Sequence, residues 1–164
     1  MKRKLLSWRE LDRRLVQERR KKKKIVFTNG CFDLVHAGHL KVFSQCRKWG
    51  DVLVVGLNSD ASVRRIKGPK RPILTQNERG ALLAAMALID YVVFFNEDTP
   101  EKLIRMVKPD VLAKGGDWKA DSIKGREFAK KVVRIPLLKG RSTSGLIDLI
   151  VKRYGRRSNK KTAC

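Results

Sequence analysis

Short apolar runs alternate with amphipathic segments along this chain. Five of the runs are rich in β-branched and aromatic residues and are followed by turn-forming residues, a pattern typical of buried β-strands. These predicted strands lie at 24–30, 51–57, 91–95, 110–117 and 132–136.

The segments around these runs have the pattern of helices. Ser7 and Glu10 form a capping box at the start of the first, and Thr75 and Glu78 form another further along. Thr99 is the expected cap of a third. The predicted helices lie at 7–20, 38–50, 59–66, 75–89, 99–107 and 142–155.

Strands that alternate with helices predict an α/β protein with a parallel sheet covered on both faces. We expect a Rossmann-like, doubly wound, five-stranded sheet with the order 3-2-1-4-5, counting the predicted strands along the chain. No linker divides the sequence, so we predict one domain over 1–155, with its first helix at about 7–20. Residues 156–164 are expected to form a basic, disordered tail.

Composition narrows the class of protein. The chain has 164 residues, 42% of them hydrophobic, which suits one globular domain. It contains neither an apolar run long enough to span a membrane nor a secretory signal, so we expect no membrane partner. The three cysteines match no zinc or disulfide spacing, and we expect reduced thiols in a cytoplasmic protein.

The net charge of +23 is concentrated at the two ends. Residues 1–24 hold 12 Lys/Arg and 3 Asp/Glu, and residues 152–164 hold 6 Lys/Arg and no acid. Such runs can bind nucleic acids or anionic surfaces, or can simply be solvated ends. No aromatic residues interleave with them as a stacking platform would require, so nucleic acid is not favoured as a partner.

Three polar clusters follow predicted strands, at 30–39, 114–118 and 140–145. Ligands of open parallel sheets bind beyond the carboxyl ends of the strands, near the point where the strand order reverses. With the predicted order, these three clusters converge on one cleft.

The first cluster, "GCFDLVHAGH", contains both histidines of the chain, His36 and His39. They stand at a helix N-terminus, where free N–H groups favour phosphate. Gly38 between them would let the chain approach a ligand closely. The alternatives are two capping or surface histidines, or half of a zinc site, although no third ligand of suitable spacing is near.

The other clusters add groups that can bind anions. Hydroxyls at 142–144 begin the last helix, beyond what ordinary capping needs. "KGGDW" places Lys114 and Asp117 around a glycine pair, where the carboxylate could hold ribose hydroxyls or the glycines could simply form a turn. A Gly/Pro loop carries basic residues that could close over phosphates or be solvated: Arg64, Arg65, Lys67, Lys70 and Arg71.

Together, "TNGCFDLVHAGH" and the later "STS" resemble the HxGH and ISTT-type motifs of the cytidylyltransferase-like nucleotidyltransferases. More narrowly, "LNSDASVRRIKGPKRP", "FNEDTPEKLI" and "PDVLAKGGD" resemble the adenylyltransferase half of the bifunctional heptose 7-phosphate kinase/heptose 1-phosphate adenylyltransferases. The resemblance covers about 5–151. It implies an enzyme that transfers a nucleoside monophosphate from a nucleoside triphosphate to a sugar 1-phosphate, with loss of pyrophosphate.

The resemblance also implies roles for individual residues. Catalytic roles at the phosphates fall on His36, His39, Lys67 and Arg79. The nucleotide-binding set is Thr28, Asn29, Gly30, Phe32, Gly38, Lys114, Gly115, Asp117, Ser142, Thr143 and Ser144. Asp33 and Asp60 would shape the acceptor pocket. No metal site in the protein is expected; Mg²⁺ would come with ATP as the substrate, and relatives suggest a homodimer.

The kinase half of the bifunctional enzymes is absent from this sequence. In "LLKGRST", Leu137 stands where cytidine-using relatives have an arginine in "RTEGIST". This favours ATP over CTP and ADP-heptose as the product, of use for lipopolysaccharide or another surface glycan. A cytidylyltransferase, an adenylyltransferase with another phosphorylated acceptor, and a basic nucleic-acid-binding protein on this fold are the alternatives.

Overall fold

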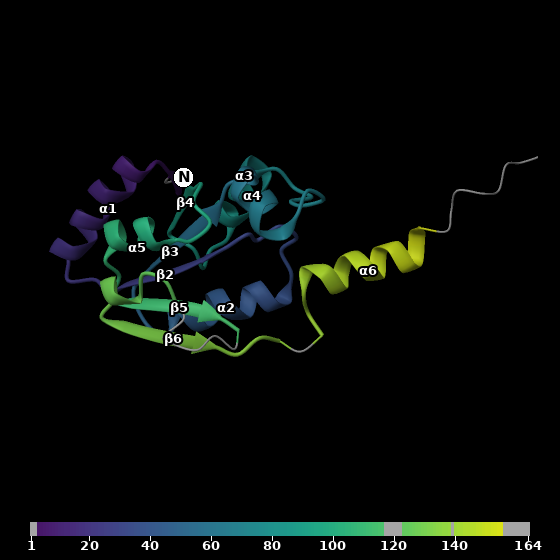
Figure 1. Cartoon of the computed structure of the whole chain (residues 1–164). Coiled ribbons are helices and arrows are strands. Elements are labelled where there is room, and N and C mark those ends of the chain that lie inside the picture. Colours follow the sequence, from purple (N-terminus) through teal and green to yellow (C-terminus); the bar gives the residue numbers. More distant parts are fainter. Residues whose placement is uncertain (1–2, 117–122, 139, 156–164) are drawn as a thin grey trace, which may run out of the picture.

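The computed structural model describes residues 3–116, 123–138 and 140–155. Its strands form one parallel sheet with the order β1-β4-β3-β2-β5-β6, shown in Figure 1. The strands are β1 (Leu5–Leu6), β2 (Ile25–Gly30), β3 (Val52–Asn58), β4 (Tyr91–Phe95), β5 (Val111–Gly115) and β6 (Lys131–Ile135).

The five predicted strands are present, and their relative order is the predicted one. The predicted number of strands is wrong, because β1 adds a sixth at the edge. Leu5 and Leu6 pair with Val92 and Val93 of β4. A two-residue strand is too short for a period-two pattern, so only its pairing reveals it.

Helices cover both faces of the sheet. On one face, α1 (Trp8–Arg20) and α5 (Glu101–Val107) contribute Leu11, Leu15 and Leu103 to a buried cluster. On the other face, α2 (Ala37–Arg47) and α4 (Gln76–Ala85) contribute Phe43 and Leu83 to a second cluster. Every residue of the central strand β3 is buried, which explains why its sequence is apolar up to the final Asn58.

The remaining helices are α3 (Asp60–Lys67), the short 3₁₀ helix η2 (Arg126–Phe128) and α6 (Thr143–Tyr154). Both predicted capping boxes are present, at α1 and α4. The predicted Thr99 cap is absent. Pro100 takes the N-cap position of α5, and no side chain caps that helix. α4 ends at Ala85, before the predicted end of the helix, because Met86 adopts an extended conformation.

In the described part of the chain, no helix is both long and apolar enough to cross a bilayer. α6 projects away from the body of the domain (Figure 1). The tail predicted at 156–164 lies outside the described residues.

Candidate active site

A cleft of about 650 Å³ opens at the carboxyl edge of the sheet. β2 lies between β3 and β5, so the chain leaves β2 towards one side for β3 and later returns on the other side for β5. The cleft lies at this reversal of strand order, the place where open α/β sheets bind ligands. Its wall contains most of the predicted site residues: Thr28, Asn29, Gly30, Phe32, Asp33, His39, Lys67, Lys114, Gly115, Ser142, Thr143 and Ser144.

Four predicted residues are near the cleft but do not line it: His36, Gly38, Asp60 and Arg79. Asp117 lies outside the described residues. The three clusters predicted from the sequence therefore supply residues to one cavity, although not every member of them faces it.

The two histidines form a stacked pair at the start of α2. Their ring centroids are 3.9 Å apart and the rings are inclined by 20°. His36 is the N-cap residue, and its Nδ1 accepts a hydrogen bond of 3.1 Å from the Gly38 backbone N–H. An accepting Nδ1 leaves the proton of the neutral ring on Nε2. Phe32 contacts His39 edge-on, with centroids 5.1 Å apart, so the position of each ring depends on its neighbour.

The position of the His36 ring requires a glycine at Gly38. A Cβ atom at this position would lie 2.8 Å from Cε1 and 2.9 Å from Nδ1 of the His36 ring. Any other residue would push the ring from its place on His39. A side chain of the same motif therefore lies close to this glycine. The close approach of a ligand to Gly38 stays a prediction.

Both imidazoles are neutral near pH 7. Burial, and then the neighbouring His36, lower the pKa of His39 to about 4. Burial and the charge of Arg141 also lower the pKa of His36. The Nδ1 atom of His39 is buried and has no hydrogen-bond partner among the described residues. A buried polar atom without a partner is rare and often marks a functional position.

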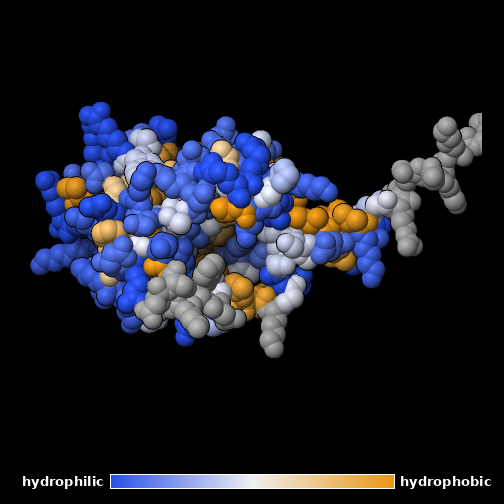
Figure 2. All heavy atoms as spheres, in the orientation of Figure 1, coloured by the Kyte–Doolittle hydropathy of each residue, from blue (hydrophilic) through white to orange (hydrophobic). Residues whose placement is uncertain are grey.

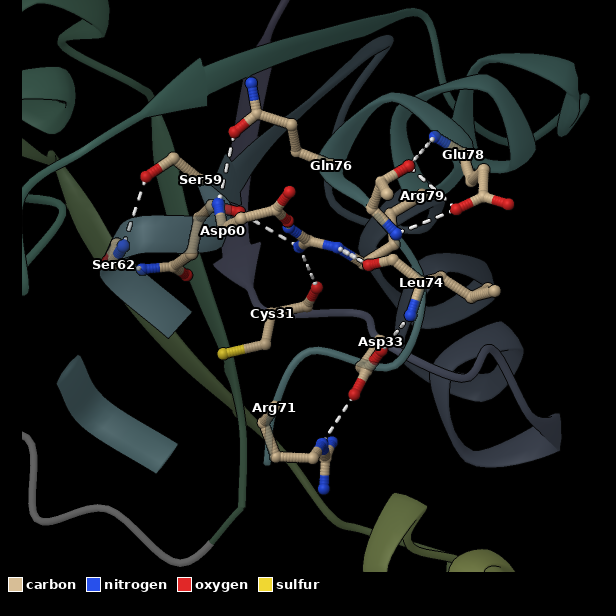
Figure 3. A network of polar contacts seen from close by, with 12 residues as sticks. Cys31, Asp33, Ser59, Asp60, Ser62, Arg71, Leu74, Gln76, Glu78 and Arg79 are labelled. Carbon is tan, nitrogen blue, oxygen red and sulfur yellow. Dashed lines mark hydrogen bonds and ion pairs between the residues drawn. The ribbon is translucent and has the colours of Figure 1, made fainter. Parts of the chain in front are cut away.

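Arg79 connects the segment after β2, the junction of β3 with α3 and the loop before α4 (Figure 3). Its side chain is 0% exposed. Nε donates to the carbonyl of Leu74 at 3.0 Å, and Nη1 donates to the carbonyls of Cys31 at 2.6 Å and Asn58 at 2.9 Å. Nη2 pairs with Oδ1 of Asp60 at 2.7 Å.

These contacts correct two expectations. Most of the guanidinium donors of Arg79 are already bound to protein oxygens, so the arrangement favours a positioning role over the expected contact with phosphate. The same ion pair directs Asp60 towards Arg79 and away from the acceptor pocket, whose lining does not include it.

Asp33 anchors the basic loop. Its side chain is only 1% exposed. It accepts a hydrogen bond from Nε of Arg71, and its Oδ1 accepts from the backbone N–H groups of Ile73 at 2.8 Å and Leu74 at 3.0 Å (Figure 3). Asp33 therefore shapes the cleft by holding Arg71 in its wall, and its carboxylate is already occupied.

The start of α6 forms part of the cleft wall. Ser142 is the N-cap, and its Oγ accepts a hydrogen bond of 3.0 Å from the Gly145 backbone N–H. This hydroxyl thus performs the ordinary capping role considered as the alternative. The hydroxyls of Thr143 and Ser144 also border the cleft, next to the free backbone donors of a helix N-terminus.

Lys114 adds a cation whose pKa is lowered. Its Nζ donates a hydrogen bond to Oδ1 of Asn29 at the floor of the cleft. Burial lowers the pKa of Lys114 from 10.5 to about 8. The lysine therefore loses its charge as the pH rises through about 8, unless a bound anion stabilises the ammonium form.

This gives a pH prediction. The apparent KM for ATP, the nucleotide that the sequence resemblance implies, should rise as the pH increases above about 8, because the neutral amine no longer attracts phosphate. Lys114→Arg should keep a nearly constant KM over that range, since a guanidinium stays charged. Steady-state assays of both proteins across this range test it, with Lys124→Arg in the same cleft as the control. Identical pH profiles for wild type and Lys114→Arg would contradict a phosphate-binding role for Lys114.

The sequence analysis missed several residues of the cleft wall. Asn58 ends β3, and Asp98 and Thr99 follow β4, so the rule that pointed to the other clusters could have found them. Ile123 and Lys124 come from the connection before β6, and no sequence pattern marks them. The full set that was missed is Cys31, Val42, Asn58, Ile66, Asp98, Thr99, Pro100, Ile123 and Lys124.

Among the described residues, no group of three His, Cys, Asp or Glu side chains could hold a metal ion. The carboxylates at the cleft already have cationic partners: Asp33 pairs with Arg71, and Asp98 pairs with Arg65. These residues do not fit a metal held by protein ligands alone.

Comparisons with known proteins agree with this geometry. Residues 27–158 match the family model described as Cytidylyltransferase-like. The bifunctional protein HldE of Syntrophotalea carbinolica is 51% identical over 141 residues, which cover 84% of this chain and 29% of the relative. HldE of Campylobacter concisus is 52% identical over 147 residues, covering 90% of this chain and 31% of the relative. The chain thus spans less than a third of the length of these relatives.

A solved structure shares the fold. The lipopolysaccharide core biosynthesis protein from Thermoplasma volcanium superposes with a TM-score of 0.62 at 30% identity. The match covers 71% of this chain and 99% of that one. The predicted Rossmann-like α/β class is confirmed by this neighbour and by the parallel sheet.

Proposed function

Because the chain belongs to the cytidylyltransferase-like family, we propose that it transfers AMP from ATP to a sugar 1-phosphate. The acceptor that best fits the resemblance is D-glycero-D-manno-heptose 1-phosphate, and the products are ADP-heptose and pyrophosphate. The observation that carries the proposal is the convergence of His39, Lys67, Lys114 and the α6 N-terminus on one cleft. These groups all attract phosphate and come from four separate segments of the chain.

The reaction needs no protein nucleophile. A phosphate oxygen of the sugar 1-phosphate attacks the α-phosphorus of ATP, a new P–O bond forms, and the bond to the β-phosphate bridging oxygen breaks. The electron pair of that bond leaves with pyrophosphate. Catalysis of such a transfer depends on positioning and on stabilisation of the charge that develops.

The cleft supplies donors for each part of this charge. The neutral His39 imidazole would donate to the α-phosphate as charge builds on it, with His36 fixing its ring. Lys67 and Lys114 would bind the phosphates of the leaving group. The N-terminus of α6 at Thr143 and Ser144 would bind the β- and γ-phosphates. Mg²⁺ would enter on the triphosphate as part of the substrate.

The choice of adenine rests on Leu137. This side chain lines the cleft and lies near Gly115. A Cβ atom added to Gly115 would lie 3.5 Å from a methyl carbon of Leu137. An aliphatic group can pack against a purine ring but offers no donor to the oxygen of cytosine. ATP and sugar phosphates are cytoplasmic metabolites, and we place the reaction in the cytoplasm.

Pyrophosphate release tests the proposal. Purified protein with Mg²⁺ is given ATP, CTP, GTP or UTP, each with and without heptose 1-phosphate. We expect release only with ATP and the heptose phosphate together. Faster release with CTP would overturn the base assignment and keep the reaction class. No release with any nucleotide, over a panel of phosphorylated acceptors, would contradict the proposed activity.

A further inference from the structure

Arg71 lies in the cleft wall and is held there by a buried carboxylate (Figure 3). Its Nε donates a hydrogen bond to Oδ2 of Asp33. The side chain of Asp33 is fully buried, whereas that of Arg71 is 16% exposed. The other oxygen of Asp33 accepts from the backbone N–H groups of Ile73 and Leu74. One carboxylate therefore fixes both the guanidinium and the loop that carries it.

Arg71 still has donors to offer. Among the described residues, neither Nη1 nor Nη2 of Arg71 has a hydrogen-bond partner. These two nitrogens form a planar fork that can bind two oxygens of one phosphate at the same time. The contrast is Arg79, in which both terminal nitrogens are bound to protein oxygens.

The cleft has room for more than one anionic group in its charge balance. Its wall contains two aspartates, and each is already paired with an arginine, Asp33 with Arg71 and Asp98 with Arg65. It also contains four cationic side chains, which are Lys67, Arg71, Lys114 and Lys124. This excess of positive charge suits a reaction in which two phosphorylated substrates meet.

The geometry of the reaction distinguishes Arg71 from the other cations. In a transfer at the α-phosphorus, the attacking and leaving oxygens lie roughly in line, on opposite sides of that atom. The leaving pyrophosphate is assigned above to Lys114, at the end of β5, and to the start of α6, which follows β6. Both β5 and β6 lie on one side of β2, whereas Arg71 follows β3 and α3, on the other side. The attacking group would therefore enter from the side of Arg71.

Lys67 comes from the same side of β2 as Arg71 but is held differently. It is the last residue of α3, it is exposed, and its side chain has no hydrogen bond among the described residues. A lysine that nothing fixes can follow the departing phosphates. Arg71 is instead fixed before any substrate binds, as a group that orients an attacking oxygen must be.

We propose that Arg71 binds the phosphate of the acceptor and that Asp33 is its positioning residue. Two oxygens of a phosphate monoester would bind Nη1 and Nη2. The third oxygen would form the new bond to the α-phosphorus as the bond to pyrophosphate breaks on the opposite side. This inference rests on the proposed function and adds that the protein recognises the acceptor at its phosphate.

Steady-state kinetics give the first test. Arg71→Gln, whose amide can still donate to Asp33, should raise the KM for heptose 1-phosphate about 10- to 100-fold, the range for lost hydrogen bonds to a charged group. The KM for ATP should stay unchanged. Arg71→Lys keeps the charge without the fork and should recover part of the loss. An unchanged KM for the acceptor, or a rise in the KM for ATP alone, would overturn the proposal.

Asp33→Asn tests the positioning role. Its amide oxygen can still accept from the loop N–H groups, but the charge that holds Arg71 is gone. The KM for heptose 1-phosphate should rise, and the double variant with Arg71→Gln should be no worse than Arg71→Gln alone, because the two residues act as one unit. Effects that multiply would contradict this role. Thermal unfolding by circular dichroism checks that each variant is folded.

A binding measurement separates this inference from the activity itself. Heptose 1-phosphate is titrated by calorimetry into protein saturated with the α,β-methylene analogue of ATP, which cannot release pyrophosphate. Arg71→Gln should bind the sugar phosphate about 10- to 100-fold more weakly than the wild type. Such binding without turnover would contradict the proposed activity and keep the inference, and turnover that is independent of Arg71 would do the reverse. If the wild type does not bind heptose 1-phosphate, both are wrong.

The matched control is Arg153→Gln. It removes the same charge near the end of α6, where the helix projects beyond the body of the domain (Figure 2). Arg153 does not line the cleft, so both KM values should equal those of the wild type. A loss as large as that in Arg71→Gln would reveal a general effect of net charge and overturn the assignment of the acceptor phosphate to Arg71.

Discussion

His39→Ala is expected to lower kcat for pyrophosphate release by about 100- to 1000-fold, the usual effect of losing one preorganised donor to a developing charge. The neutral ring of His39 lines the cleft, and burial together with His36 holds its pKa at about 4. The donor is therefore in place without an added proton throughout the neutral range. The measurement is kcat with saturating ATP and acceptor.

His36 requires a subtler substitution, because its Nδ1 also caps α2. His36→Ala removes both the cap and the stacked ring, and loss of a cap alone costs about 1 kcal/mol of stability. His36→Asn keeps a capping oxygen and removes only the ring. We expect His36→Asn to fold like the wild type and still lose most of its turnover, because His39 is no longer held in place. Near-normal turnover in both His39→Ala and His36→Asn would remove the histidines from the mechanism.

Arg79→Ala is expected to lower the free energy of unfolding by about 3 kcal/mol, because it removes one partner of a buried network. Three backbone carbonyls, of Cys31, Asn58 and Leu74, would lose a donor together. Asp60 would lose its cationic partner. Urea unfolding followed by circular dichroism measures the loss, and Arg79→Lys should recover only part of it, since an ammonium cannot reach all four oxygens.

A matched control distinguishes this network from an ordinary ion pair. Arg65 pairs with Asp98 at 2.7 Å, but the two side chains are 46% and 56% exposed. Arg65→Ala should therefore change stability by less than about 1 kcal/mol. If Arg79→Ala has the stability of the wild type but a much higher KM for ATP, the positioning role is wrong. That result would support the original expectation that Arg79 contacts phosphate directly.

Much of the architecture could be predicted because its causes are local. The apolar runs at β3 and β4 have the length and composition of strands, and the capping boxes at Ser7 and Thr75 mark where α1 and α4 start. Alternation of these elements limits the topology, because parallel strands need crossover helices. β1 was not predicted, because a strand of two residues has no recognisable pattern of apolar and polar positions.

The site was predicted less completely. The motifs located the cleft, since polar residues after adjacent parallel strands must meet at one edge. They could not separate the residues that face substrate from those that hold the wall. Arg79 and Asp33 have the charges expected of phosphate and acceptor ligands, yet both are buried against oxygens or N–H groups of the protein.

The sequence by itself determined the five main strands and their order, the six α-helices to within a few residues, and the segments that converge on the cleft, because apolar periodicity and capping act over a few neighbouring residues. Only the tertiary structure decided the direction of each charged side chain and the exposure of the apolar residues of α6. Those features depend on contacts between segments far apart in the chain, such as Arg79 with Cys31. Burial and available hydrogen-bond partners set the role of a polar group, and neither is encoded in the local pattern.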